Sequence, residues 1–357
     1  ETIRMAEANG YVDLNTVIAE NKQLKAGDKV YFNNMGKALA LFLIGSEPLE
    51  KGMKILGAHV DSPRIDLKQV PFYEDTEMAL LDTHYYGGIK KYQWVTLPLA
   101  LHGVVVKKDG TVVNVCIGEK ADDPVVGITD LLIHLSAKQM GKKASEVIEG
   151  EDLNILIGSM PLEGEEKDAV KANVLKMLKD TYDIEADDFV SAEIEAVPAG
   201  AARDFGLDRS MVMGYGHDDR VCAYPAMTAM FESLPSSPHT MMCILADKEE
   251  TGSDGNSGMQ CDLILDLIDA IAESQKASPA AVRAASICLS ADVSAAFDPN
   301  FGEAFEKRNS SLLSCGVVLT KYMGSRGKGG TNDASAEFIG RLRAMMAKDD
   351  VVWQAGE

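Results

Sequence analysis

Adjacent glutamates follow an apolar run in the stretch ILADKEETGSDG, residues 244–255. Glu249 and Glu250 come directly after what reads as a buried strand, although a glutamate is rarely buried without a partner. A solvated loop is one interpretation of such a pair. The other is the edge of an active site, where one carboxylate binds a metal ion and its neighbour transfers protons. The rest of the sequence is needed to choose between them.

Two further apolar runs end in acidic residues in the same way. They are GAHVDSP at 57–63 and SADVSAA at 290–296, and GYGHDDR at 214–220 has the same acidic character at an expected helix start. In an open α/β sheet, ligands bind beyond the carboxyl ends of the strands. Like charges gathered at one edge repel unless cations neutralise them, so the pattern favours a metal site. The candidate residues are His59, Asp61, Asp218, Asp219, Glu249, Glu250 and Asp292.

His59 and Asp61 are two residues apart on an expected strand, so their side chains point to the same face. This spacing suits a metal-bound imidazole with a carboxylate behind it. For the pair alone, a hydrogen-bonded core histidine is the alternative. A mixed set of nitrogen and oxygen ligands suits zinc, with cobalt or manganese as alternatives.

Alternating helical and strand-like segments surround these residues. The first sixty residues read as helix, short strand, helix and strand, and the alternation resumes after residue 208. It predicts an α/β domain whose parallel or mixed sheet has helices on both faces. The expected helices are 221–234, 259–274 and 334–346, and the expected strands are 53–61, 240–246, 284–291, 312–322 and 351–354.

The middle third of the chain has a different pattern. Between residues 68 and 207, short strand-like pieces are divided by Gly, Asp and Pro, and one amphipathic helix is expected over 165–182. The Lys-Asp-Gly in LHGVVVKKDGTVVNVCIGE lies between valine runs and indicates a hairpin. We therefore expect a β-rich domain over 68–207, inserted into a catalytic domain formed by 1–67 and 208–357.

Composition excludes several classes of function. The formal net charge of −20 argues against binding to nucleic acid or to anionic membranes. No apolar run is long enough to span a membrane, and the six cysteines form no Cys-x-x-Cys pair, which predicts a soluble cytoplasmic protein. His-Glu-x-x-His, Gly-x-Ser-x-Gly and phosphate-loop motifs are absent, and the glycine-rich GSRGKGGTND at 324–333 has the wrong spacing for a phosphate loop.

Five stretches together carry a resemblance to a known family. In order along nearly the whole chain, GAHVDSPRIDLK, GHDDR, DKEETGS, SADVSAAFDPNF and GTNDAS resemble the aspartyl aminopeptidase and aminopeptidase I family of dinuclear zinc metallopeptidases. The resemblance implies a zinc exopeptidase-like catalytic domain with an inserted β-rich dimerisation domain. It also implies dimers assembled into a hollow dodecamer, and removal of N-terminal amino acids, acidic ones above all, from peptides.

The resemblance also assigns metal ligands. It implies that His59 and Asp292 hold one divalent ion, that Glu250 holds a second, and that Asp218 bridges the two. Zinc is the expected metal.

Other residues receive catalytic and substrate-binding roles by the same resemblance. Asp61 would orient the metal-bound histidine, and Glu249 would be the general base. The stretch DDPVVGITDLLIHLSAKQ is similar to a family segment whose histidine reaches a neighbouring subunit's active site, which places His134 there; an ordinary histidine at a helix start is the alternative. Lys321 matches a family lysine near the substrate.

One family feature is missing. The family completes its second metal site with a histidine near the C-terminus, whereas the last histidine here is His239. We expect that the chain is truncated, and a variant with another ligand is the alternative. Two other functions remain open on the sequence: a dinuclear-metal deacylase of small N-acyl substrates, and an inactive family member that serves as an assembly or binding protein.

Overall fold

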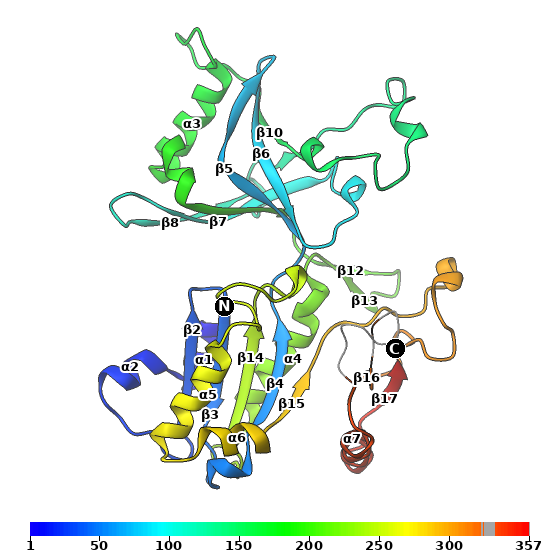
Figure 1. The fold of residues 1–357 in the computed structure, drawn as a ribbon. Coiled ribbons are helices and arrows are strands. Elements are labelled where there is room, and N and C mark those ends of the chain that lie inside the picture. Colours follow the sequence, from blue (N-terminus) through cyan, green and yellow to red (C-terminus); the bar gives the residue numbers. More distant parts are fainter. Residues whose placement is uncertain (323, 325–332, 357) are drawn as a thin grey trace. The chain divides into compact units, whose positions relative to one another are not determined.

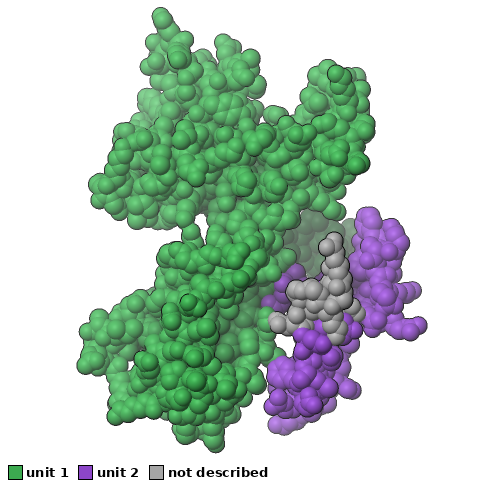
Figure 2. All heavy atoms as spheres, viewed as in Figure 1, with its two compact units in different colours: residues 1–290 green, residues 291–357 purple. Residues whose placement is uncertain are grey.

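The computed structural model describes residues 1–322, 324 and 333–356. The chain forms two compact units, Glu1–Ser290 and Ala291–Glu357 (Figure 2). Among the described residues, no helix has the length and apolar character needed to cross a membrane.

A six-stranded mixed sheet organises one part of the first unit (Figure 1). Its three neighbouring strands β14, β4 and β15 run parallel, while β3 is antiparallel both to β14 and to β2. The mixed α/β sheet was predicted, but the hairpin formed by β2 and β3 was not. In spatial order the strands are β1 (Val12–Asp13), β2 (Lys29–Asn34), β3 (Ala38–Leu43), β14 (Met241–Ala246), β4 (Lys54–His59) and β15 (Ile287–Ser290).

Helices cover both faces of this sheet, as predicted. Alternate residues of a strand point to opposite faces. Along β14, Met242 and Ile244 therefore pack in one core, while Cys243 and Leu245 pack in the other. The first core includes α2 (Leu14–Ala19), α5 (Leu263–Ser274) and α6 (Pro279–Ala285), and the second includes α1 (Thr2–Ala8) and α4 (His217–Glu232).

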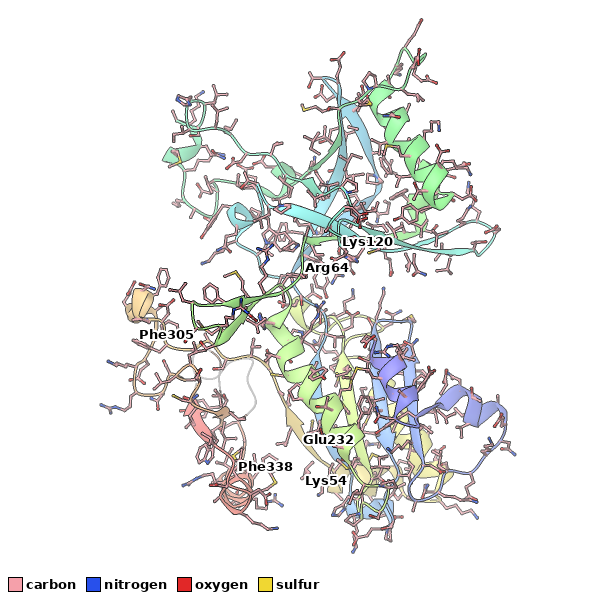
Figure 3. The ribbon with its side chains drawn as sticks, turned by 180° about the vertical axis from the view of Figure 1, so that it is seen from behind. Lys54, Arg64, Lys120, Glu232, Phe305 and Phe338 are labelled. Atoms are coloured by element: carbon pink, nitrogen blue, oxygen red, sulfur yellow. The ribbon has the colours of Figure 1, made fainter. Side chains whose placement is uncertain are left out.

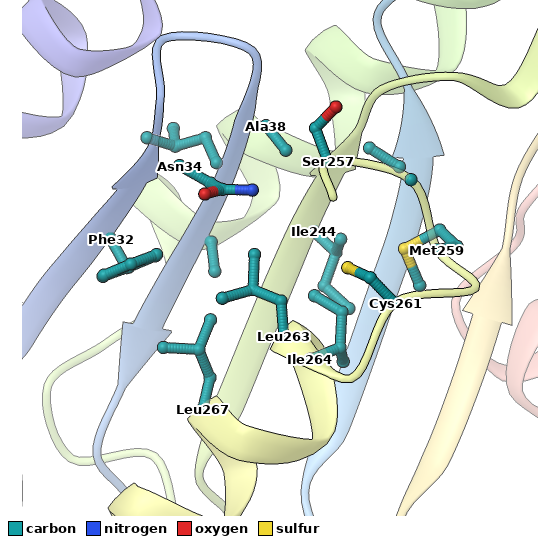
Figure 4. A pocket seen from close by; sticks show the side chains of 14 residues that line it. Phe32, Asn34, Ala38, Ile244, Ser257, Met259, Cys261, Leu263, Ile264 and Leu267 are labelled. Atoms are coloured by element: carbon teal, nitrogen blue, oxygen red, sulfur yellow. The ribbon is translucent and has the colours of Figure 1, made fainter. Parts of the chain in front are cut away.

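A small apolar pocket lies in the first of these cores, beside the start of α5. Phe32, Ile244, Leu263 and Leu267 are among the side chains that line it (Figure 4). Its lining is mostly apolar, whereas the strand ends described above are acidic.

The inserted domain is a closed antiparallel barrel. Pairing of β7 with β11 closes a ring of six strands, and β8 pairs with β7 outside that ring. The predicted hairpin is confirmed, since Asp109 and Gly110 lie in the turn between β7 and β8. In ring order the strands are β11 (Ala192–Pro198), β5 (Arg64–Asp75), β6 (Met78–Tyr86), β10 (Ile155–Gly158), β9 (Val126–Gly127) and β7 (Pro98–Val106), with β8 spanning Val112–Ile117.

The remaining elements of the first unit are short, apart from one helix. Helix α3 (Ala169–Tyr182) lies where an amphipathic helix was predicted, and its residues Val174 and Leu178 contribute to packing against the barrel. A two-stranded hairpin joins β12 (Arg203–Phe205) and β13 (Met211–Met213). The 3₁₀ helices are η1 (Leu49–Lys51), η2 (Lys91–Gln93), η3 (Gln139–Gly141), η4 (Gly150–Asp152), η5 (Ala186–Ser191) and η6 (Glu249–Thr251).

The second unit contains a small parallel pair of strands. It comprises η7 (Pro299–Ala304), β16 (Val317–Thr320), α7 (Ala336–Lys348) and β17 (Trp353–Gly356), and β16 pairs with β17. Phe338 lies in the first turn of α7 (Figure 3). The expected strand 312–322 is shorter than predicted, and residues 325–332 of the glycine-rich segment lie outside the described residues.

One predicted strand was partly wrong. The expected strand 284–291 begins as the end of α6 and becomes extended only at Ile287. The physical reason is Pro279, which follows Ser278 and starts a helix because its fixed φ suits the first helical position. The predicted domain boundaries at 67/68 and 207/208 stay a prediction.

Closure of the barrel predicts a sensitive glycine. Gly103 of β7 pairs with Ile194 of β11, has a φ of +144°, and a Cβ added there would lie 1.9 Å from the carbonyl oxygen of Glu193. We expect Gly103→Ala to destabilise the fold by about 1–3 kcal/mol, as overpacking does. The measurement is the thermal unfolding midpoint. The control is Gly141→Ala, which meets no atom within 4 Å; equal midpoints for the two variants would contradict the expectation.

Candidate metal centre

Sheet register brings two acidic segments to one edge. In the parallel pairing of β4 with β14, His59 is opposite Ala246, so both strands end at the same level. Asp61 follows β4, and the chain after β14 turns into η6, which carries Glu249 and Glu250. The start of α4 contacts the same edge, because the Ser62 hydroxyl donates to the backbone carbonyl of Asp218 at 2.7 Å.

The buried carboxylate of Asp61 joins these segments. Its Oδ1 accepts a hydrogen bond from the backbone N–H of Glu249 at 3.1 Å, and its Oδ2 accepts from that of Glu250 at 3.2 Å. The Tyr86 hydroxyl also donates to Oδ2, at 2.7 Å. Burial alone would disfavour the charge, but these bonds and the one from His59 outweigh it and lower the pKa of Asp61 to about 2. The carboxylate is therefore ionised at neutral pH and can only accept.

This arrangement fixes the state of the His59 ring. Nδ1 lies 2.9 Å from the backbone carbonyl oxygen of Asp61 and 3.4 Å from Oδ1 of the same residue. Both partners are acceptors, so Nδ1 must carry the proton. In the neutral imidazole, the lone pair is then on Nε2, and this is the tautomer that binds a metal ion through Nε2.

The lone pair of His59 faces carboxylate oxygens. Nε2 lies 3.0 Å from Oδ1 of Asp218 and 3.9 Å from Oε2 of Glu249. One ligand atom each from His59, Asp218 and Glu250 lies within 4.8 Å of the others. Oδ1 of Asp218 and Oε1 of Glu250 are buried and have no hydrogen-bond partner among the described residues.

A divalent cation would fit these atoms. Electron-rich acceptors held this close repel one another, and buried polar atoms without partners are costly. Burial, together with the charge of Asp218, raises the pKa of Glu250 to about 7, which shows how unfavourable another negative charge is at this point. One imidazole nitrogen with carboxylate oxygens is a donor set that suits zinc.

Asp219 has a different environment from its neighbour Asp218. The peptide bond between them is cis. Asp219 is fully buried, and its Oδ2 accepts a hydrogen bond from the backbone N–H of His59 at 3.3 Å. Asp219 therefore helps to attach the start of α4 to the end of β4.

Three further sequence-predicted residues belong to the inserted domain or to the second unit. His134 is exposed in a turn of the inserted domain. Lys321 and Asp292 belong to the second unit, where Lys321 pairs with Asp333 at 3.0 Å and Asp292 Oδ1 accepts from the backbone N–H of Val293. Their functional roles stay predictions.

Sequence reasoning missed two residues that touch the cluster. Tyr86 ends β6 and donates to Asp61, and Gly87 follows it with a φ of +76°. A Cβ on Gly87 would lie 3.2 Å from Cβ of Glu250, so the chain passes this glutamate closely. The only signal in the sequence is the run His-Tyr-Tyr-Gly-Gly at 84–88, which matches no chemical motif.

The chain is similar to known zinc metalloproteases. A family model described as "Aminopeptidase I zinc metalloprotease (M18)" matches residues 4–356. A protein of Clostridium acetobutylicum named "Probable M18 family aminopeptidase 1" is 58% identical over 362 residues, which cover 100% of this chain and 78% of that protein. The crystal structure of aminopeptidase I from Clostridium acetobutylicum is 58% identical and superposes with a TM-score of 0.93, covering 99% of this chain and 78% of that one.

A more distant structure is similar in fold. The S. cerevisiae mApe1 dodecamer is 19% identical and has a TM-score of 0.76, covering 99% of this chain and 80% of that one. At this identity the likeness shows the fold alone. The predicted combination of a mixed α/β sheet with an inserted β-rich domain is confirmed by the likeness to the Clostridium structure.

The acceptor cluster predicts loss of metal on removal of one carboxylate. We expect Asp218→Ala to retain less zinc than the parent chain, because Oδ1 of Asp218 is one of the clustered ligand atoms. If Asp218 bridges two ions, the loss exceeds that in His59→Ala. Elemental analysis of the purified chains measures it, with the exposed Asp254→Ala as the matched control. Equal zinc in Asp218→Ala and the parent would refute the assignment.

Proposed function

The chain belongs to the aminopeptidase I zinc metalloprotease (M18) family, and we propose how its own residues carry out the reaction of that family. It is a metalloaminopeptidase, a peptide hydrolase, and membership of the family confirms the enzyme class predicted from the sequence. The assignment of roles below rests on the cluster formed by His59, Asp218 and Glu250.

We propose that each subunit holds two divalent ions, with zinc as the metal. His59 and Asp292 would hold one ion, Glu250 would hold the other, and Asp218 would be shared by both. The observation that carries the proposal is a pair of buried oxygens beside Nε2 of His59: Oδ1 of Asp218 and Oε1 of Glu250 accept no hydrogen bond from the residues that the structure describes. Cobalt and manganese accept the same ligand types and are alternatives.

Bound zinc supplies an acidified water and polarisation of the scissile carbonyl. The protein's own part in the reaction is proton transfer and positioning. We propose Glu249 as the general base: its side chain is 48% exposed, so water and substrate can reach it, and its backbone N–H is fixed on Asp61. The carboxylate takes the proton of the attacking water and gives it to the leaving amine as the peptide C–N bond breaks.

We also propose which residues select the substrate. An enzyme that removes N-terminal residues must accept a free α-amine, which a carboxylate-rich site favours. A preference for acidic N-terminal residues requires a local positive charge, since the chain carries a formal net charge of −20. We propose Lys321 and His134 as the residues that supply it.

We propose that the chain works as a homo-oligomer of dimers, reaching a dodecamer. The support is the likeness in fold to the S. cerevisiae mApe1 dodecamer and the exposed apolar segment that carries His134. In that segment Leu132, Ile133 and Leu135 are 58%, 69% and 66% exposed, which is unusual for side chains of this type. A partner subunit would cover them and bring His134 to its active site. A cytoplasmic location stays a prediction from composition.

A substrate panel tests the function and the base together. With zinc, cobalt or manganese, we expect the parent chain to hydrolyse unblocked aminoacyl amides and to leave N-acyl amino acids intact. Glu249→Gln should keep its zinc but lose about 10²–10⁴-fold in turnover, because an amide cannot accept the proton of water.

Two results of the panel would contradict the proposal. Release of amino acids from N-acyl substrates alone would favour the deacylase alternative. Near-parental turnover by Glu249→Gln would show that another group is the base. Zinc content measured on the same samples separates loss of the base from loss of metal.

Mixing of inactive chains tests the role of His134. We expect His134→Ala and Glu249→Gln to be inactive separately, because one lacks the substrate contact and the other lacks the base. If His134 acts on a partner's site, mixed oligomers formed by joint refolding regain part of the activity. Restored turnover in the mixture is the measurement. Full activity of a chain that light scattering shows to be a monomer would refute a role of His134 in a partner's site. His102→Ala, on barrel strand β7, is a suitable control for loss of a histidine in the inserted domain.

A further inference from the structure

A tyrosine of the inserted barrel reaches the centre of the hydrogen-bond network behind the metal ligands. Tyr86 ends β6 and is 8% exposed, and its hydroxyl lies 2.7 Å from Oδ2 of Asp61. The same oxygen accepts from the backbone N–H of Glu250. The contact therefore joins the barrel to the loop that carries the two glutamates.

The ring of Tyr86 is held by a charged group of the barrel. The guanidinium carbon of Arg64 lies 3.7 Å from the ring centroid, within the range of a cation–π interaction. Nε of Arg64 lies 2.8 Å from Oδ1 of Asp66 and 3.2 Å from Oε1 of Glu195. Arg64 is at the start of β5 (Figure 3) and its side chain is only 10% exposed, so this support is largely shielded from solvent.

The residue after Tyr86 makes a second, independent approach to the site. Gly87 passes so close to Glu250 that an added Cβ would lie 3.2 Å from Cβ and 3.5 Å from Oε2 of the glutamate. The end of β6 thus touches a predicted metal ligand directly and also contacts the carboxylate that supports the others.

We propose that Tyr86 is a positioning residue for the metal centre, through which the inserted barrel sets the geometry of His59 and of the Glu249–Glu250 pair. The inference rests on the proposed function, since it assumes that these residues hold zinc. It gives the barrel a part in each subunit's own metal site, in addition to any part in assembly.

The physical argument is the sharing of one carboxylate. Oδ1 of Asp61 faces Nδ1 of His59 and the N–H of Glu249, while Oδ2 faces the Tyr86 hydroxyl and the N–H of Glu250. Without the hydroxyl, Oδ2 keeps one donor and the carboxylate can rotate about its terminal bond. Metal ligands must be held within about 0.5 Å of their productive positions, so this rotation disturbs both ends of the ligand set.

Tyr86→Phe isolates the hydroxyl because it retains the ring beside Arg64. We expect its zinc affinity to fall about tenfold, as when outer-shell partners of metal ligands are removed, with kcat reduced more than KM is changed. The matched control is Tyr85→Phe: Tyr85 is the preceding residue of β6, points to the opposite face and is 39% exposed. Chelator competition on the metal-free chain measures zinc affinity without relying on activity.

A double-mutant cycle tests the route through Asp61. If the hydroxyl acts only through that carboxylate, Tyr86→Phe has no further effect on zinc affinity in an Asp61→Asn background. Additive losses would overturn that route, and an unchanged zinc affinity in Tyr86→Phe would overturn the inference, even if its thermal midpoint fell. A parent chain that binds no zinc would instead overturn the proposed function and, with it, this inference.

Discussion

One buried carboxylate controls the arrangement of the acidic edge. Asp61 accepts hydrogen bonds from the two backbone amides of the Glu249–Glu250 pair and from the Tyr86 hydroxyl, and it faces Nδ1 of His59. These donors come from β4, from the loop after β14 and from the barrel, so a single charged group joins three segments distant in sequence. A carboxylate that is buried without hydrogen-bond donors is unfavourable. Separating these segments would therefore cost free energy, and the Asp61 carboxylate holds them together.

The sheet makes this concentration of charge possible. Parallel strands end at the same edge, and the register that places His59 opposite Ala246 sets β4 and β14 level there. Apolar packing on both faces of the sheet, with Met242 on one side and Cys243 on the other, stabilises strands whose ends carry several acidic side chains. Burial of these apolar side chains therefore offsets the electrostatic repulsion among the acidic groups at the strand ends.

Local sequence patterns predicted the strands, helices and acidic strand ends of this molecule better than its long-range contacts. The alternation of segments predicted the mixed sheet, and acidic strand ends predicted that His59, Asp218 and the two glutamates belong together. The hairpin of β2 and β3 was missed because its apolar residues 38–43 are buried on both faces and show no period of two. Tyr86 was missed for another reason: its partner Asp61 is 25 residues away, and no local pattern marks a tyrosine whose role is set by the closure of a barrel.

The electrostatics of the cluster favour the metal-bound form. Without an ion, burial and Asp218 raise the pKa of Glu250 to about 7 from its ordinary value of 4.5. A carboxyl with a raised pKa contributes stability that is present below its ordinary pKa and is lost as the pH rises through about 7. At neutral pH the metal-free fold therefore carries either a proton on Glu250 or an unfavourable charge. A bound divalent cation would make the ionised form of Glu250 favourable, because it interacts with the carboxylate and with the lone pair of His59 at the same time. The residues that Asp61 holds in place are thus arranged for a bound ion, and their mutual repulsion becomes a source of affinity for it.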